Sequence, residues 1–249
     1  MKEVILNEEN FEFKKAVKQN IKENVIPLLK AEHFVAYTLN KYIREVDYIA
    51  QFVIFRFEVD RMKAFAAYYP IFVPFDNLLS YGIEITGSSG IKLLGGKYFT
   101  TIYESEPSDN QIRFQNFQEQ HLEKLDKMFL SFKEGIIPEF NEINSFDKFI
   151  NKFDDAEPKF FGDRFRRHFR NHEVHKYIVS IDHCLNKQFE QGVVELKNLV
   201  NDNAEDVISQ CAKYLLYAQE GDSIVTREQF VTRLENICDY MRRKYKLIK

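Results

Sequence analysis

The residues best suited to binding chemistry lie together in one segment, between positions 159 and 176. Arginines and histidines are interleaved there with phenylalanines. The basic residues are Arg164, Arg166, Arg167, Arg170, His168, His172 and His175. The planar guanidinium of arginine can bind a carboxylate or a phosphate through two parallel hydrogen bonds. The segment therefore favours binding of nucleic acid or of a phosphorylated ligand. The alternative is a solvated amphipathic helix whose arginines pair with nearby acidic residues, namely Asp154, Asp155 and Glu157.

The three histidines of this segment have a spacing that metal sites use. His168, His172 and His175 stand at i, i+4 and i+7, so an unbroken helix would place the imidazoles on one face. Residues 171–173, however, have the composition of a cap between two helices, and no His-Glu-x-x-His pattern is present. We therefore expect neither a metal nor a cofactor.

Other patterns of catalytic residue types lack catalytic spacing. Gly90 and Gly95 resemble a phosphate-binding loop, but Gly96 separates Gly95 from Lys97, and no Ser or Thr follows Lys97. The run 182–184, Asp-His-Cys, cannot form a triad, because consecutive residues of a helix point in different directions. No catalytic residue is predicted, and an enzyme whose site the sequence hides remains an alternative.

Polar side chains also interrupt the predicted sheet. Asn40, Tyr42 and Arg44 alternate, so a strand would place them on one face, and Gln51 lies within a run that is otherwise almost entirely apolar. If helices cover that face, these residues can bind a ligand or a partner in a groove. Otherwise they are ordinary strand residues on the solvent side.

The composition excludes several classes of protein. The 249 residues are 45% hydrophobic with a formal net charge of -3, which argues against global disorder and against a general attraction to nucleic acid or anionic lipid. No apolar run is long enough for a membrane span or a signal peptide. We expect the three cysteines to be reduced, buried thiols of a cytoplasmic protein. The 24 Phe residues are expected to pack the core.

The first half predicts one helix followed by strands. The helix starts after Asn7 and carries an apolar stripe, and Pro27 should end or kink it. The stripe comprises Phe13, Val17, Ile21, Val25 and Leu28. Strands are expected at 37–46, 48–58, 63–73, 78–86 and 97–104. Because the connections are short, we expect antiparallel pairing.

The second half has helical periodicity. A helix over 114–132 should end at Gly135, and Ser145 should cap a short helix. Further helices are expected at 160–171, 173–191, 193–201, 204–219 and 226–246, the last with a capping box of Thr226 and Gln229. We predict an α+β fold, an antiparallel sheet flanked by helices and followed by a helical C-terminal region. Residues 1–155 would form the α+β domain, and 156–249 a helical region that is either separate or packed on it as one unit.

The first 155 residues resemble the bacterial DUF4304 family of unknown function. Residues 28–34, Leu-Leu-Lys-Ala-Glu-His-Phe, are similar to the family's helix followed by Lys-x-x-Gly-Phe, with His33 where the family usually has Gly. The polar strand 40–44, residues 47–52, and the segments 137–141 and 145–153 follow in the family's order. The resemblance implies a fold and no activity.

These observations favour a non-enzymatic protein-interaction module of the bacterial cytosol. Its partner is a protein of unknown identity, and self-association to a homo-oligomer is left open. Nucleic acid or a phosphorylated ligand bound through residues 164–170 is the alternative. We expect no membrane association.

Overall fold

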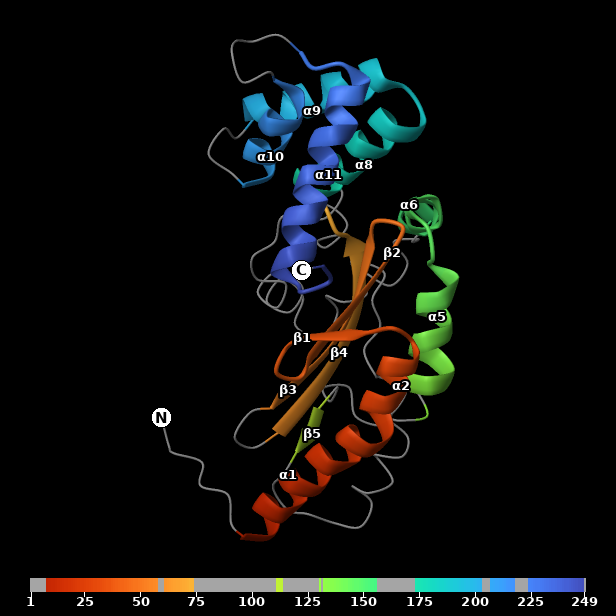
Figure 1. Ribbon diagram of the computed structural model, residues 1–249, viewed down its shortest axis with the longest axis vertical. Helices are drawn as coiled ribbons and strands as arrows, with labels where there is room; N and C mark the ends of the chain where they lie inside the picture. Colours follow the sequence, from red (N-terminus) through yellow and green to blue (C-terminus); the bar gives the residue numbers. More distant parts are fainter. Residues whose placement is uncertain are drawn as a thin grey trace. The chain divides into compact units, whose positions relative to one another are not determined.

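The computed structural model describes residues 8–57, 61–73, 111–113, 130, 132–155, 173–202, 207–217 and 224–248 (Figure 1). The chain forms two compact units, one of Met1–Tyr68 with Leu78–Asn144, the other of Tyr69–Asn77 with Ser145–Lys249. An antiparallel sheet followed by helices confirms the predicted α+β class. The division expected after residue 155 stays a prediction.

The sheet has five strands in sequence order, β1 (Val35–Thr38), β2 (Lys41–Val46), β3 (Ile49–Phe57), β4 (Arg61–Pro70) and β5 (Gln111–Arg113). The pairs β1–β2, β2–β3 and β4–β5 are antiparallel, as predicted. Every residue from position 49 to 55 is buried, as expected for a central strand that is covered on both faces. The expected strands at 78–86 and 97–104 lie outside the described residues.

Two tight turns separate the first three strands, and the first of them divides a segment that the sequence pattern predicts as one strand. The segment expected as one strand over 37–46 is β1, a turn, and β2, because Asn40 adopts a positive φ of 61°. The next turn places both of its central residues, Asp47 and Tyr48, at positive φ of 45° and 65°. A two-residue loop of this hand matches the twist of an antiparallel hairpin.

The first helix continues through its proline. It comprises α1 (Glu8–Asn20), a π-helical turn (Ile21–Val25) and α2 (Ile26–Ala31). The sequence predicts that Pro27 ends or kinks the helix. The prediction of an end is wrong, because Pro27 lies inside α2. The N–H of Ile26 donates to the carbonyl of Ile21, five residues back. This π-helical turn contains one more residue than an α-helical turn, and the helix continues from it through Pro27.

The π-helical turn also changes which leucine is buried. The buried stripe consists of residues spaced by four, namely Phe13, Val17, Ile21, Val25 and Leu29. In a regular α-helix, with 3.6 residues per turn, residues spaced by four drift gradually around the helix. One π-helical turn, which holds more residues, brings the series back to the buried face. Leu29 therefore replaces Leu28, which is half-buried.

A second π-helical turn precedes the second Ile-Pro pair of the chain. A π-helical turn (Phe132–Ile136) leads directly into α5 (Ile137–Glu142), which has Pro138 in its first turn. The expectation that Gly135 ends this helix is therefore wrong. Gly135 lies inside the wide turn and the helix continues to Glu142.

The second unit is helical. It contains α6 (Phe146–Asp155), α8 (Glu173–Asn186), α9 (Phe189–Asp202), α10 (Val207–Leu216) and α11 (Arg227–Lys244). Ser145 Oγ accepts the N–H of Lys148 at 3.2 Å, and Thr226 with Gln229 forms the predicted capping box. Phe72 packs on Phe146 and on Tyr177, with ring centroids 5.5 and 6.2 Å apart, which agrees with the expected packing role of phenylalanine.

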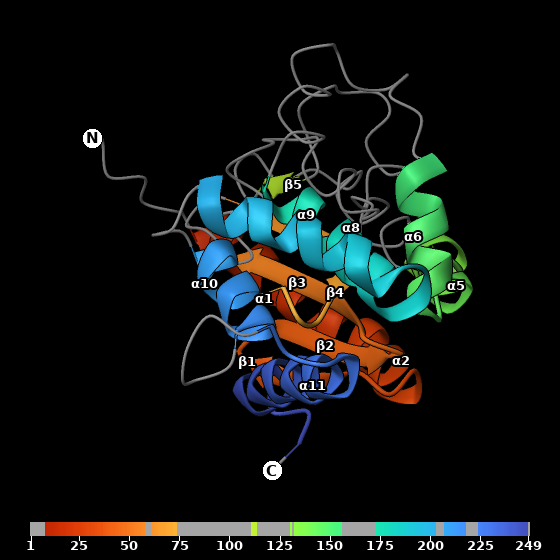
Figure 2. The same cartoon turned by 90° about the horizontal axis from the view of Figure 1, so that it is seen from above.

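Helices α8 and α9 lie side by side and touch closely (Figure 2). The expected break near residue 192 falls instead at residues 187–188, and Gly192 lies inside α9. A Cβ added at Gly192 would lie 2.5 Å from Cys184 Sγ and 2.6 Å from the carbonyl oxygen of Ser180. Glycine is required here because the two backbones approach each other.

Candidate functional site

The basic segment predicted to bind anions lies outside the described residues. This covers Arg164, Arg166, Arg167, Arg170, His168 and His172. Binding of nucleic acid or of a phosphorylated ligand through these residues stays a prediction.

The three polar residues that the sequence places on one strand face do not all share that face. Asn40 lies in the turn before β2, so it does not share the strand face with the other two. Tyr42 and Arg44 are on β2 but only 8% and 7% exposed, so the interpretation of them as solvent-side residues is wrong. The Tyr42 ring packs against Phe55, 6.3 Å between centroids, and burial raises the pKa of its hydroxyl.

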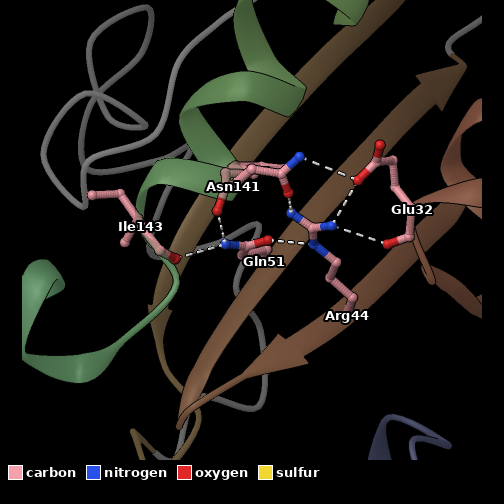
Figure 3. A network of polar contacts seen from close by, with 6 residues as sticks. Glu32, Arg44, Gln51, Asn141 and Ile143 are labelled. Atoms are coloured by element: carbon pink, nitrogen blue, oxygen red, sulfur yellow. Dashed lines mark hydrogen bonds and ion pairs between the residues drawn. The ribbon is translucent and has the colours of Figure 1, made fainter.

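Arg44 and Gln51 form the centre of a buried polar network (Figure 3). The two residues are direct partners in the β2–β3 register, and Arg44 Nε donates to Gln51 Oε1 at 2.5 Å. Gln51 is fully buried. The pairing places a cation and an amide side by side on one face of the sheet.

Arg44 binds the end of α2. Its Nη1 donates to the backbone oxygen of Glu32 at 3.0 Å and to Glu32 Oε2 at 3.1 Å. Glu32 is the C-cap residue of α2. A cation is favourable there because the last carbonyls of a helix carry partial negative charge.

Gln51 and Arg44 bind the end of α5 in the same way. Gln51 Nε2 donates to the carbonyl oxygens of Phe140 at 2.6 Å and Ile143 at 3.0 Å. Arg44 Nη2 donates to Asn141 Oδ1 at 2.5 Å, and Asn141 Nδ2 reaches Glu32 Oε2 at 3.3 Å. One cross-strand pair therefore holds the C-terminal ends of two helices against the sheet.

The electrostatics of this network favour a structural role. Burial lowers the pKa of Arg44, while the charge and hydrogen bond of Glu32 act in the opposite direction. The guanidinium also stacks over the Phe34 ring, 4.9 Å from its centroid. Because the donors of Arg44 already point at protein acceptors, the network positions α2 and α5 rather than presenting groups to a substrate.

Arginines of α11 cap helices of the second unit in the same manner. Arg227 donates to the carbonyl oxygen of Leu185, in the last turn of α8. Arg233 Nη1 donates to the carbonyl oxygen of Tyr214 at 2.6 Å, and also to that of Tyr217, at the end of α10. Sequence patterns indicated none of these contacts, because each joins residues that are far apart in the chain.

A groove of about 510 Å³ runs between α8 and α9. Its charged side chains are already paired. Lys176 Nζ lies 3.8 Å from Asp202 Oδ2, and Glu195 Oε2 lies 2.7 Å from His183 Nδ1. The groove has the volume of a ligand pocket. It is lined by Lys176, Val179, Ser180, Glu195, Asn198, Leu199 and Asp202.

Two titratable groups of the second unit, Cys184 and Tyr177, are buried and do not line this groove. Burial raises the pKa of the Cys184 thiol to about 12 and that of the Tyr177 hydroxyl well above its usual range. Cys184 therefore behaves as a small buried hydrophobe, as expected. Within the described ranges, no three His, Cys, Asp or Glu side chains gather into a potential metal site.

The exposed part of α10 and α11 carries a different group of side chains, here called the Tyr–Arg surface: Tyr214, Arg233, Asn236 and Tyr240. Arg233 stacks on the Tyr214 ring at 5.4 Å, and Asn236 Nδ2 donates to the Tyr214 hydroxyl at 3.2 Å. Tyr240 lies one helical turn beyond Asn236. Tyr214 is 40% exposed and Tyr240 64% exposed. The Tyr214 ring is thus held in place while it faces solvent, and Tyr240 is exposed on the neighbouring helix α11.

No family model, curated protein or solved structure matches this chain. The resemblance to the DUF4304 family stays a prediction. In the described part of the chain, no helix combines the length and apolarity needed to cross a bilayer.

Proposed function

We propose that this chain is a non-enzymatic protein-binding module of the bacterial cytosol, and that the Tyr–Arg surface is part of its contact region. The observation that carries the proposal is that Arg233 stacks on the exposed Tyr214 ring, with the exposed Tyr240 on the neighbouring helix α11. Tyrosine and arginine are, with tryptophan, the residues enriched at the energetic centres of protein interfaces.

The contacts within the surface support this role. Arg233 and Asn236 hold the Tyr214 ring before any partner arrives. A side chain that is already ordered loses little conformational entropy on binding, so more of its contact energy is retained as affinity.

Two further observations support a non-enzymatic, cytosolic protein. The described groups with raised pKa values, such as Tyr68, Tyr177 and Cys184, are buried in packed regions and do not line the α8–α9 groove. Catalytic acids and bases are instead expected where a cleft and a shifted pKa coincide. Cys184, Cys211 and Cys238 form no disulfide, which is usual for reducing compartments.

Photo-crosslinking in the native host tests the proposal. The photoreactive residue p-benzoylphenylalanine would replace Tyr240, and in a control chain it would replace Phe11, an exposed aromatic of α1. We expect a discrete protein adduct from position 240 that is absent from position 11. Failure to form an adduct at 240, or the same adducts at both positions, would overturn the proposal.

A further inference from the structure

The Tyr–Arg surface continues into a group of basic side chains at the end of α11. Arg243, Lys244 and Lys246 are all exposed, and they follow Tyr240 directly along the helix and its end. Lys213, next to Tyr214 on α10, is exposed as well. Aromatic and cationic side chains therefore occupy neighbouring positions.

The acidic side chains in the C-terminal part of α11 bind Arg242. From Thr232 to the end of α11, the acidic residues are Glu235 and Asp239. Both bind Arg242 Nη1, at 3.0 and 2.8 Å. Between positions 235 and 246 of the sequence, four basic side chains (Arg242, Arg243, Lys244 and Lys246) therefore stand against two acidic ones, and this end of α11 is net positive.

The cations are not needed to complete the hydrogen bonds of the helix end. The N–H groups of Tyr245, Lys246 and Leu247 bind the carbonyls of Met241, Arg243 and Arg242. Lys246 has a positive φ of 60°, which closes this end with backbone groups alone. The positive charges of Arg243 and Lys244 are also favourable at the C-terminal end of the helix dipole.

We propose that this surface binds an acidic segment of a partner protein. Arg243 and Lys244 would contact its carboxylates, and Tyr214 and Tyr240 would pack against the side chains between them. Opposite charge on a partner accelerates encounter and fixes its orientation, while the tyrosines supply contact area. This inference rests on the proposed function and adds the chemistry of the partner.

The test uses the full chain and a defined acidic probe. The probe is a fluorescein-labelled copolymer of glutamate and tyrosine, and its binding is followed by fluorescence anisotropy at low and high salt. We expect the variant R243E/K244E to weaken binding at least about tenfold, and Tyr240→Ala about threefold or more. The neutral variant R243Q/K244Q should show an intermediate loss and guards against misfolding of the charge-reversed chain.

A matched control separates this surface from overall charge. The variant K15E/K22E changes net charge equally on exposed positions of the first helix, and we expect binding to change less than about twofold. Equal losses from both double variants, or no binding of the copolymer, would overturn the inference. Tighter binding of a single-stranded RNA through the same residues would also overturn it. A protein adduct at Tyr240 without copolymer binding would leave the proposed function standing and refute only the acidic partner.

Discussion

Arg44 and Gln51 face each other across β2 and β3, and between them they hold the ends of two helices that are distant in sequence. The side chains of Glu32 and Asn141, which meet at Arg44, are 109 residues apart. The pair therefore joins segments that no local sequence pattern connects.

Replacing the buried guanidinium should be strongly destabilising. We expect Arg44→Met to lower the free energy of unfolding by about 2–4 kcal/mol, because Gln51, Asn141 and Glu32 lose a charged donor. Urea denaturation measures the change. Arg242→Met removes a more exposed cation and should cost less than about 1 kcal/mol. Equal losses in the two variants would contradict a special role for Arg44.

His33 occupies a backbone conformation that favours glycine. Its φ is 63°, and the N–H groups of His33 and Phe34 close the end of α2 on Lys30 and Leu29 at 3.1 and 2.9 Å. We expect His33→Gly to stabilise the protein by about 0.5–1 kcal/mol, since glycine adopts this φ without a steric penalty. Thermal melts of the two variants measure the change, and His33→Ala should give no gain in stability. A destabilised glycine variant would show that the His33 side chain contributes more than its backbone costs.

The contact between α8 and α9 leaves no space for a side chain at Gly192. Gly192→Ala should destabilise the chain by about 1–3 kcal/mol, because its Cβ would overlap Cys184 Sγ and the Ser180 carbonyl. Adding Cys184→Ala should recover only part of the loss, since the backbone overlap remains. Full recovery would show that the thiol alone sets the helix separation.

The three cysteines should differ in reactivity. At pH 8 a thiol with a pKa of about 12 is ionised in about one molecule in ten thousand, so Cys184 should resist iodoacetamide. Cys238 is also buried, whereas Cys211 is partly exposed and should be labelled first. Peptide mass spectrometry over time, with and without urea, measures the order. Rapid labelling of Cys184 in the native protein would indicate opening of the α8–α9 contact.

The start of α11 should make stability depend on pH. Hydrogen bonds from backbone and Thr226 lower the pKa of Glu228 below its ordinary 4.5. A lowered folded-state pKa means that the carboxylate stabilises the fold above the unfolded-state value, and that this contribution is lost as pH falls through the folded-state value. Glu228→Gln should therefore lower the melting temperature at pH 7 and have little effect in strong acid. A difference that is the same at all pH values would contradict this assignment.

Local signals predicted local structure well. Thr226 and Gln229, and Ser145 at the start of α6, were recognisable because a cap contacts residues three positions away. The choice of Leu29 over Leu28 was not predictable, since it depends on a π-helical turn that period-3.6 patterns do not contain.

The polar network was predictable only in part. Gln51 stands out as an amide within an apolar run, and that signal does indicate a buried partner. Asn141 carries no such signal, and its contact with Arg44 follows from how α5 packs on the sheet. Tyr214 and Asn236 were likewise hidden, because their proximity arises from the packing of α10 on α11.

The Arg44–Gln51 pair also bears on how the chain can vary. The two residues lie seven positions apart on one hairpin, so the binding position for both helix ends forms from local contacts. The chain between β3 and α5, which includes β4 and β5, then has to return Asn141 to this position. An insertion between Arg44 and Gln51 would shift their register and separate the two side chains, so we expect the hairpin to keep its length.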